Sequence, residues 1–93
     1  MNIRWARSAT KHRISRLRIS YVIEHCGLIH VQPSPAGSGS KVDRFVYLGD
    51  DPSGRALEIM AVELAGGDLL VIHAMPLRDK YKKQYQEAMP WRR

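Results

Sequence analysis

The second half of the chain holds three apolar segments, residues 43–49, 55–64 and 69–75, which are separated by only two short turns. The turns, 50–54 (DDPSG) and 65–68 (AGGD), consist of the residue types that tight turns prefer. Strands joined by connections this short pair antiparallel with their neighbours. The sequence therefore predicts an antiparallel meander at the centre of the fold.

Shorter elements are predicted on the N-terminal side of the meander. Residues 2–5 and 28–31 are predicted to form short strands, and residues 6–13 a brief basic helix. Ser15 is a suitable N-cap and Gly27 a suitable end for a longer helix. The apolar stripe of that helix consists of Ile19, Val22, Ile23 and Cys26.

A last helix is predicted after the meander. Pro76 suits its first turn, and Met89-Pro90 would end it. Its buried stripe would consist of Leu77, Tyr81, Tyr85 and Ala88. The fold class expected is therefore α+β, a curled antiparallel sheet with the N-terminal helices and a C-terminal helix packed on one side of it.

The length and composition predict a single domain over residues 1–93. Residues 33–41 (PSPAGSGSK) have the composition of a flexible linker, but their flanks are too short for separate domains, so an internal loop is expected. Residues 89–93 would form a tail. A domain this small buries a modest share of its surface, so we also expect an oligomer or a complex.

The sequence shows neither a signal-peptide core nor a stretch of roughly 20 apolar residues that could span a bilayer. The single cysteine, Cys26, cannot form an internal disulfide, which fits a reducing compartment. We therefore expect a cytoplasmic protein that does not enter a membrane. The four histidines do not form the close pairs that a zinc site prefers, so no metal or cofactor is expected.

Positive charge is concentrated at the two ends of the chain. Within a net charge of +6, residues 1–18 carry +6 and residues 78–93 carry +4, while residues 19–77 carry −4. Such segregation favours a basic face that contacts a polyanion such as RNA. The same charges would also fit solvated helix faces that keep the domain soluble.

Four short motifs occur in order along the chain. They are KHRIS at 11–15, RFVYLG at 44–49, Gly54-Arg55 in the next turn, and VIHA at 71–74 before a basic helix that ends at Tyr85. Over roughly residues 3–88, this series resembles the BrnT family of bacterial toxins, whose fold is similar to that of the RelE-type ribonucleases.

The resemblance implies a type II toxin, a ribonuclease that cleaves mRNA, free or on the ribosome, and so inhibits translation. It also implies a cognate antitoxin that neutralises the toxin in a stable hetero-oligomer. Members of the family carry arginines directly after the last strand and a serine at the position of His73, whereas this chain has Met75-Pro76 in place of those arginines. The charge of the basic cluster would then come one turn later, from Arg78, Lys80, Lys82 and Lys83.

The chemistry of RNA cleavage without a metal selects candidate catalytic residues. It needs a base for the 2′-hydroxyl proton, donors for the phosphate charge and an acid for the leaving 5′-oxygen. Arg, Lys, His and Tyr can fill these roles. The last strand and helix hold four such residues within a short reach: His73, Arg78, Tyr81 and Lys82.

Each of these residues also has a purely structural interpretation. Strand alternation places His73 opposite Ile72 and Ala74, on an open face where it could act as base or acid, or at a sheet edge where hydrogen bonds satisfy it. Arg78, in the first turn of the helix, could grip a phosphate or simply be a surface arginine. Tyr81 falls on the buried stripe, from which its hydroxyl could still reach out.

The candidate RNA-binding residues are Arg4, Lys11, His12, Arg13, Arg44, Arg55, Lys80 and Lys83. Charge alone does not distinguish a phosphate backbone from an acidic antitoxin segment as the partner of the 11–13 run. The alternative to a ribonuclease is a non-catalytic RNA- or protein-binding module of the same fold.

Overall fold

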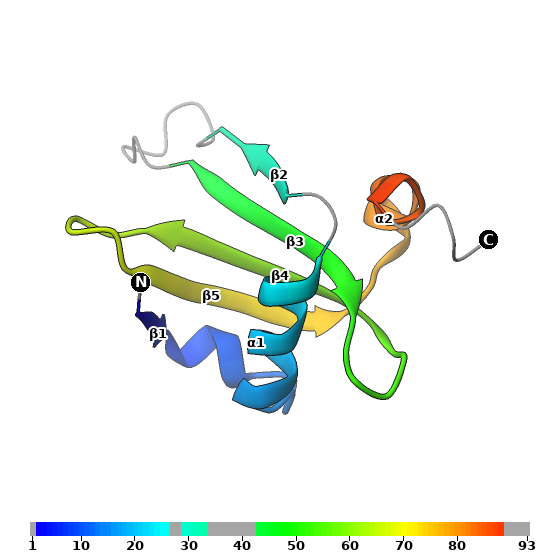
Figure 1. Ribbon diagram of the computed structural model, residues 1–93, viewed down its shortest axis with the longest axis horizontal. Coiled ribbons are helices and arrows are strands. Elements are labelled where there is room, and N and C mark those ends of the chain that lie inside the picture. The colour runs from blue at the N-terminus through cyan, green and yellow to red at the C-terminus, as the bar shows by residue number, and fades with distance from the viewer. Residues whose placement is uncertain (1, 27–28, 34–42, 89–93) are drawn as a thin grey trace.

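The predicted meander forms the centre of a five-stranded sheet in the computed structural model, which describes residues 2–26, 29–33 and 43–88 (Figure 1). The order across the sheet is β1-β5-β4-β3-β2. The strands are β1 (Ile3–Trp5), β2 (Ile29–Gln32), β3 (Arg44–Asp50), β4 (Ala56–Glu63) and β5 (Leu69–Pro76).

The sheet is mixed, whereas an antiparallel sheet was expected. Strands β2 to β5 pair antiparallel as predicted, but β1 pairs parallel to β5, with Ile3 opposite Leu69 and Trp5 opposite Val71. A parallel pair needs a long crossover connection, and the whole chain between β1 and β5 provides it.

The helical segments lie on both faces of the sheet, so the prediction of helices on one side is wrong (Figure 1). The segments are η1 (Arg7–Thr10) and α1 (Arg16–His25) on one face, and η2 (Asp79–Tyr81) and α2 (Lys82–Ala88) on the other. Strand β3 is apolar on both of its faces: Tyr47 packs with Ile19 and Val22 of α1, while Val46 and Leu48 pack with Tyr81. Helical segments therefore have to pack on each face of the sheet to bury these side chains.

Helix α1 begins where the sequence predicts. The Ser15 hydroxyl accepts a hydrogen bond from the Arg18 backbone N–H at 3.2 Å, which confirms the N-cap. Ile19 and Val22 of the predicted stripe are buried. The predicted end at Gly27, most of the 33–41 loop and the 89–93 tail lie outside the described residues.

Pro76 ends a strand and does not open a helix as predicted. It is the last residue of β5, opposite Leu57, and the next residue extends the ladder through a 3.1 Å bond from the Leu77 N–H to the Ala56 carbonyl. Proline lacks an N–H and is tolerated at such a strand end. Arg78 is therefore still extended, with φ −93° and ψ 157°, and the helical segment begins after it.

A β-bulge breaks the side-chain alternation of β5. His73 lies opposite Met60 and Val71 lies opposite Ala61, so Ile72 is the extra residue. Ile72 packs in the cluster with Met60, whereas Ala74 belongs to the cluster under α1. The register therefore turns His73 away from Ala74, as predicted, but to the same face as Ile72, which corrects that part of the prediction.

Arg13, in the connection between η1 and α1, has a φ of 59°. This left-handed conformation costs a non-glycine residue about 1 kcal/mol. We expect Arg13→Gly to be more stable than Arg13→Ala by about 1 kcal/mol, because both variants lose the same charge and only the glycine relieves the backbone. Urea unfolding of the two variants measures this difference, and equal stabilities would contradict it.

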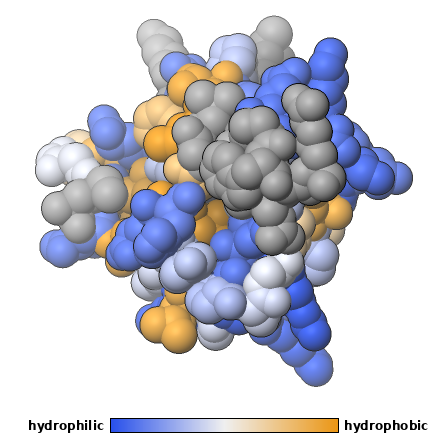
Figure 2. All heavy atoms as spheres, turned by 45° about the vertical axis from the view of Figure 1, so that its right-hand side comes forward, coloured by the Kyte–Doolittle hydropathy of each residue, from blue (hydrophilic) through white to orange (hydrophobic). Residues whose placement is uncertain are grey.

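The surface combines polar projections with apolar patches (Figure 2). Among the described residues, the exposed large hydrophobic side chains belong to α1 and to the edge strand β2: Leu17, Tyr21, Ile29 and Val31. No helix in the described part of the chain is long and apolar enough to cross a membrane.

Candidate active site

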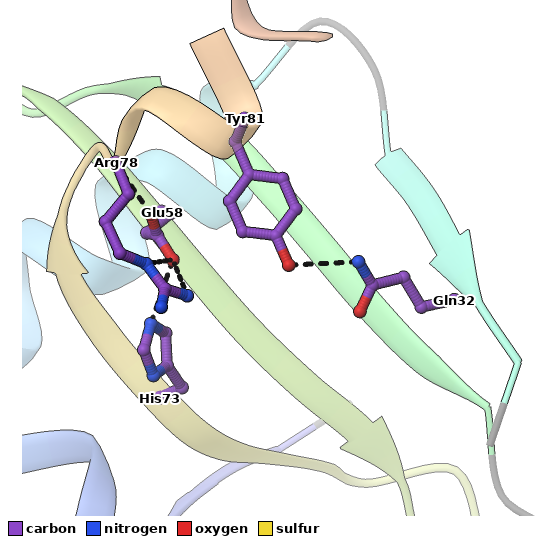
Figure 3. Close-up of polar contacts among 5 residues, drawn as sticks. All are labelled: Gln32, Glu58, His73, Arg78 and Tyr81. Carbon is purple, nitrogen blue, oxygen red and sulfur yellow. Dashed lines mark hydrogen bonds and ion pairs between the residues drawn. The ribbon is translucent and has the colours of Figure 1, made fainter. Parts of the chain in front are cut away.

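A buried carboxylate on the central strand β4 organises the candidate site. Glu58 is completely buried, and its Oε1 accepts a 2.8 Å hydrogen bond from the Arg78 backbone N–H. Its Oε2 accepts from Arg78 Nη2 at 2.6 Å, from Arg78 Nε at 2.9 Å and from His73 Nε2 at 3.0 Å (Figure 3). One carboxylate thus holds both a histidine and an arginine.

Sheet register and chain direction bring these three residues together. Glu58 and Met60 point to the same face of β4, and His73 lies opposite Met60, diagonally across from Glu58. The bulge in β5 turns the imidazole to this face. Because residue 78 continues in an extended conformation beyond the end of β5, both its backbone and its guanidinium reach Glu58.

The electrostatics keep Glu58 ionised. Burial alone would raise the pKa of its carboxyl, but hydrogen bonds from the side chain and backbone of Arg78, and then from His73, outweigh burial and lower the pKa below its ordinary value. The same ion pair raises the pKa of Arg78. The pair is therefore charged across the neutral range.

His73 is held neutral with one defined nitrogen free to act as a base. Burial lowers its pKa below the ordinary value, assisted by the charges of Arg78 and His12, against the opposing effect of Glu58. An ionised carboxylate only accepts hydrogen bonds, so Nε2 carries the proton that points to Glu58. Nδ1 is then the unprotonated nitrogen of the neutral ring.

Tyr81 lies beside this group with a buried ring. Its side chain belongs to the cluster under α2, and its hydroxyl accepts a 2.9 Å hydrogen bond from Gln32 Nε2 of β2 (Figure 3). The Arg78 guanidinium lies 5.8 Å and the Lys80 ammonium 5.1 Å from the ring centroid. Tyr81 therefore supports the cations, and a direct role of its hydroxyl in catalysis stays a prediction.

His12 approaches the site from the other end of the chain. The ring centroids of His12 and His73 are 6.3 Å apart, in an edge-to-face arrangement. Lys11, His12 and Arg13 are all exposed in the connection after η1. Of the candidate RNA-binding residues, this run and Lys80 therefore border the candidate site.

Other basic candidates lie elsewhere or are neutralised. Arg4 forms a 3.1 Å ion pair with Asp68. Arg44, the first residue of β3, lies at the same end of the sheet. Arg55 is exposed at the opposite end, just before β4, and Lys82 and Lys83 are exposed in the first turn of α2. Within the described part of the chain, the candidate basic residues are thus spread over both ends of the sheet.

Sequence reasoning missed Glu58 and Gln32. The signal for Glu58 was present, because it is the single acid within the otherwise apolar run 56–62, and buried carboxylates require partners. Nothing in the sequence marks Gln32, whose contact with Tyr81 joins residues that are 49 positions apart.

The chain matches no protein-family profile, no curated protein and no solved structure.

Proposed function

We propose that this chain is a metal-independent endoribonuclease, the toxin of a type II toxin–antitoxin pair, which cleaves mRNA and inhibits translation in the cytoplasm. The observation that carries the proposal is the buried Glu58, which bridges His73 and Arg78. This arrangement offers a neutral histidine with a fixed tautomer beside a cation that is always charged. The resemblance to BrnT toxins adds the biological setting.

In the proposed reaction, His73 Nδ1 takes the proton of a ribose 2′-hydroxyl, and the 2′-oxygen attacks the adjacent phosphorus as the bond to the 5′-oxygen breaks. The Arg78 N–H groups not engaged by Glu58 donate to the phosphate oxygens, since a guanidinium has five donors. Lys82 and the Tyr81 hydroxyl are the further candidates for contact with the reacting group. A general acid protonates the leaving 5′-oxygen, so the products are a 2′,3′-cyclic phosphate and a 5′-hydroxyl.

The proposed toxin also needs a cognate antitoxin. A protein partner is supported by the edge strand β2, two of whose four side chains, Ile29 and Val31, are apolar and exposed. The exposed Lys11 and Arg13 remain available to an RNA backbone or to an acidic segment of that partner.

We expect the purified chain to cleave a long single-stranded RNA in excess chelator. It should leave the same sequence intact when every 2′-hydroxyl is methylated, because the nucleophile is then blocked. Gel analysis and mass spectrometry of the product ends provide the measurement. Cleavage of the methylated RNA, or activity only with added metal, would refute the proposed reaction.

One observation favours a second candidate, a non-catalytic RNA-binding module. Glu58 accepts from two nitrogens of the Arg78 guanidinium, which partly neutralises the cation nearest to His73. Both candidates predict RNA binding that weakens with salt, because contacts to phosphates release counterions. Turnover by the pure chain separates them.

A further inference from the structure

We propose that His12 is the general acid of this site, the group that protonates the leaving 5′-oxygen while His73 acts as the base. The assignment rests on the proposed ribonuclease function and gives His12 a role beyond backbone contact. It would make the site a two-histidine centre, assembled from the N-terminal and C-terminal parts of the chain.

Contacts between η1 and the bulged strand bring the segment that carries His12 next to His73. The Ala6 backbone N–H donates to the Val71 carbonyl at 3.0 Å, and the Ser8 hydroxyl donates to the Ile72 carbonyl. Both acceptors are within two residues of His73, so the segment that carries His12 is attached to the bulge that turns His73.

The spacing of the two rings suits a shared substrate. At 6.3 Å between centroids, the rings are too far apart for a direct hydrogen bond and close enough to contact one phosphodiester together. In an in-line displacement the attacking and leaving oxygens lie on opposite sides of the phosphorus. One ring can therefore take the proton from the attacking oxygen while the other gives a proton to the leaving oxygen.

The two rings have different surroundings. His73 faces Glu58 of β4, Arg78 after β5 and His12 after η1, and it is half-buried, whereas His12 is exposed to water. A proton on His12 also disfavours a second charge on His73. The half-buried ring at residue 73 is therefore suited to accept a proton, and the ring at residue 12 is placed where it can exchange protons with water.

The protons balance over one turnover. His73 Nδ1 gains the proton of the 2′-hydroxyl as the bond from the 2′-oxygen to phosphorus forms. The bond from phosphorus to the 5′-oxygen breaks, and that oxygen takes the proton from His12. Exchange with water then restores a neutral His73 and a protonated His12.

The test compares two substrates that differ only in the leaving group. One is a dinucleotide, whose 5′-oxygen needs a proton, and the other is the same nucleoside 3′-(4-nitrophenyl phosphate), whose nitrophenolate leaves without one. We expect His12→Ala to lower dinucleotide cleavage about 100-fold and to change cleavage of the aryl ester by less than about threefold, because only the first substrate uses a general acid. His73→Ala should reduce both.

The matched control is His25→Ala, which removes an exposed histidine stacked on Tyr21 at the end of α1. It should leave both rates unchanged, and circular dichroism establishes that every variant is folded. Equal losses on the two substrates in His12→Ala, or no loss on either, would overturn the assignment while leaving a ribonuclease. Failure of the parent chain to cleave either substrate would instead refute the proposed function, and the role of His12 with it.

Discussion

Replacing His73 with alanine is expected to lower the rate of RNA cleavage by about two to four orders of magnitude, the usual contribution of a positioned general base. The reason lies in the Glu58 contact, which directs the Nε2 proton inward and leaves Nδ1 as the basic nitrogen. In the variant, a water molecule would have to accept the 2′-hydroxyl proton in place of that nitrogen. RNA binding should change little, because a neutral side chain is lost.

Single-turnover cleavage of a labelled RNA by the parent chain and by His73→Ala measures this effect. His73→Gln is the matched variant, since its amide can donate to Glu58 in place of Nε2 but cannot act as a base. Both variants should be folded and equally inactive. Retention of activity in either one would remove His73 from the role of base.

The pH dependence of the parent rate follows from the same contacts. Burial lowers the pKa of His73, so the acidic side of the rate profile, where the base becomes protonated, should lie below the ordinary histidine pKa of about 6.5. A loss of activity that begins above that value on acidification would indicate a different base.

The sequence predicted the meander well because its information is local. The turns at 50–54 and 65–68 determine which strands are neighbours, and the structure confirms those pairings. The parallel pairing of β1 and the packing of helical segments on both faces depend on contacts distant in sequence. No short pattern reports such contacts.

The sequence pointed to His73 and Arg78, but it missed Glu58, which joins them, and it did not give their geometry. His73 and Arg78 follow from residue type and position, yet the bulge that turns His73 is a property of the β4–β5 pair and is invisible in β5 alone. The helical position expected for Arg78 was wrong because the strand continues through Pro76. That extension is what brings residue 78 to Glu58.

Removing Arg78 is expected to change how stability responds to pH. In the parent, the lowered pKa values of Glu58 and His73 mean that the folded state holds fewer protons than the unfolded chain. Their stabilisation is complete above the unfolded values, about 4.3 and 6.5, and is lost as the pH falls through the folded values. The contribution of the parent site therefore increases as the pH rises from the acidic range towards 7.

In Arg78→Ala the buried carboxylate loses its principal partner, because His73 then provides the only other side-chain donor described for Glu58. We expect the folded variant to hold one proton on the Glu58–His73 pair. The pair should keep this proton to a higher pH than the histidine of the unfolded chain keeps its own. That raised folded pKa gives stability that is present below about pH 6.5 and is lost as the pH rises. The destabilisation caused by Arg78→Ala should therefore grow with pH.

The expected loss at pH 8 is about 3 kcal/mol, the low end for breaking a buried ion pair, because the Arg78 side chain is 39% exposed and water can partly replace it. Urea unfolding at pH 5.5, 6.5 and 8 measures the difference between variant and parent. Arg55→Ala removes the same charge from an exposed position at the same end of the sheet, and its effect should be nearly independent of pH. If the cost of Arg78→Ala is likewise constant across these pH values, Glu58 does not depend on Arg78 for its charge, and the electrostatic basis assigned to the site is wrong.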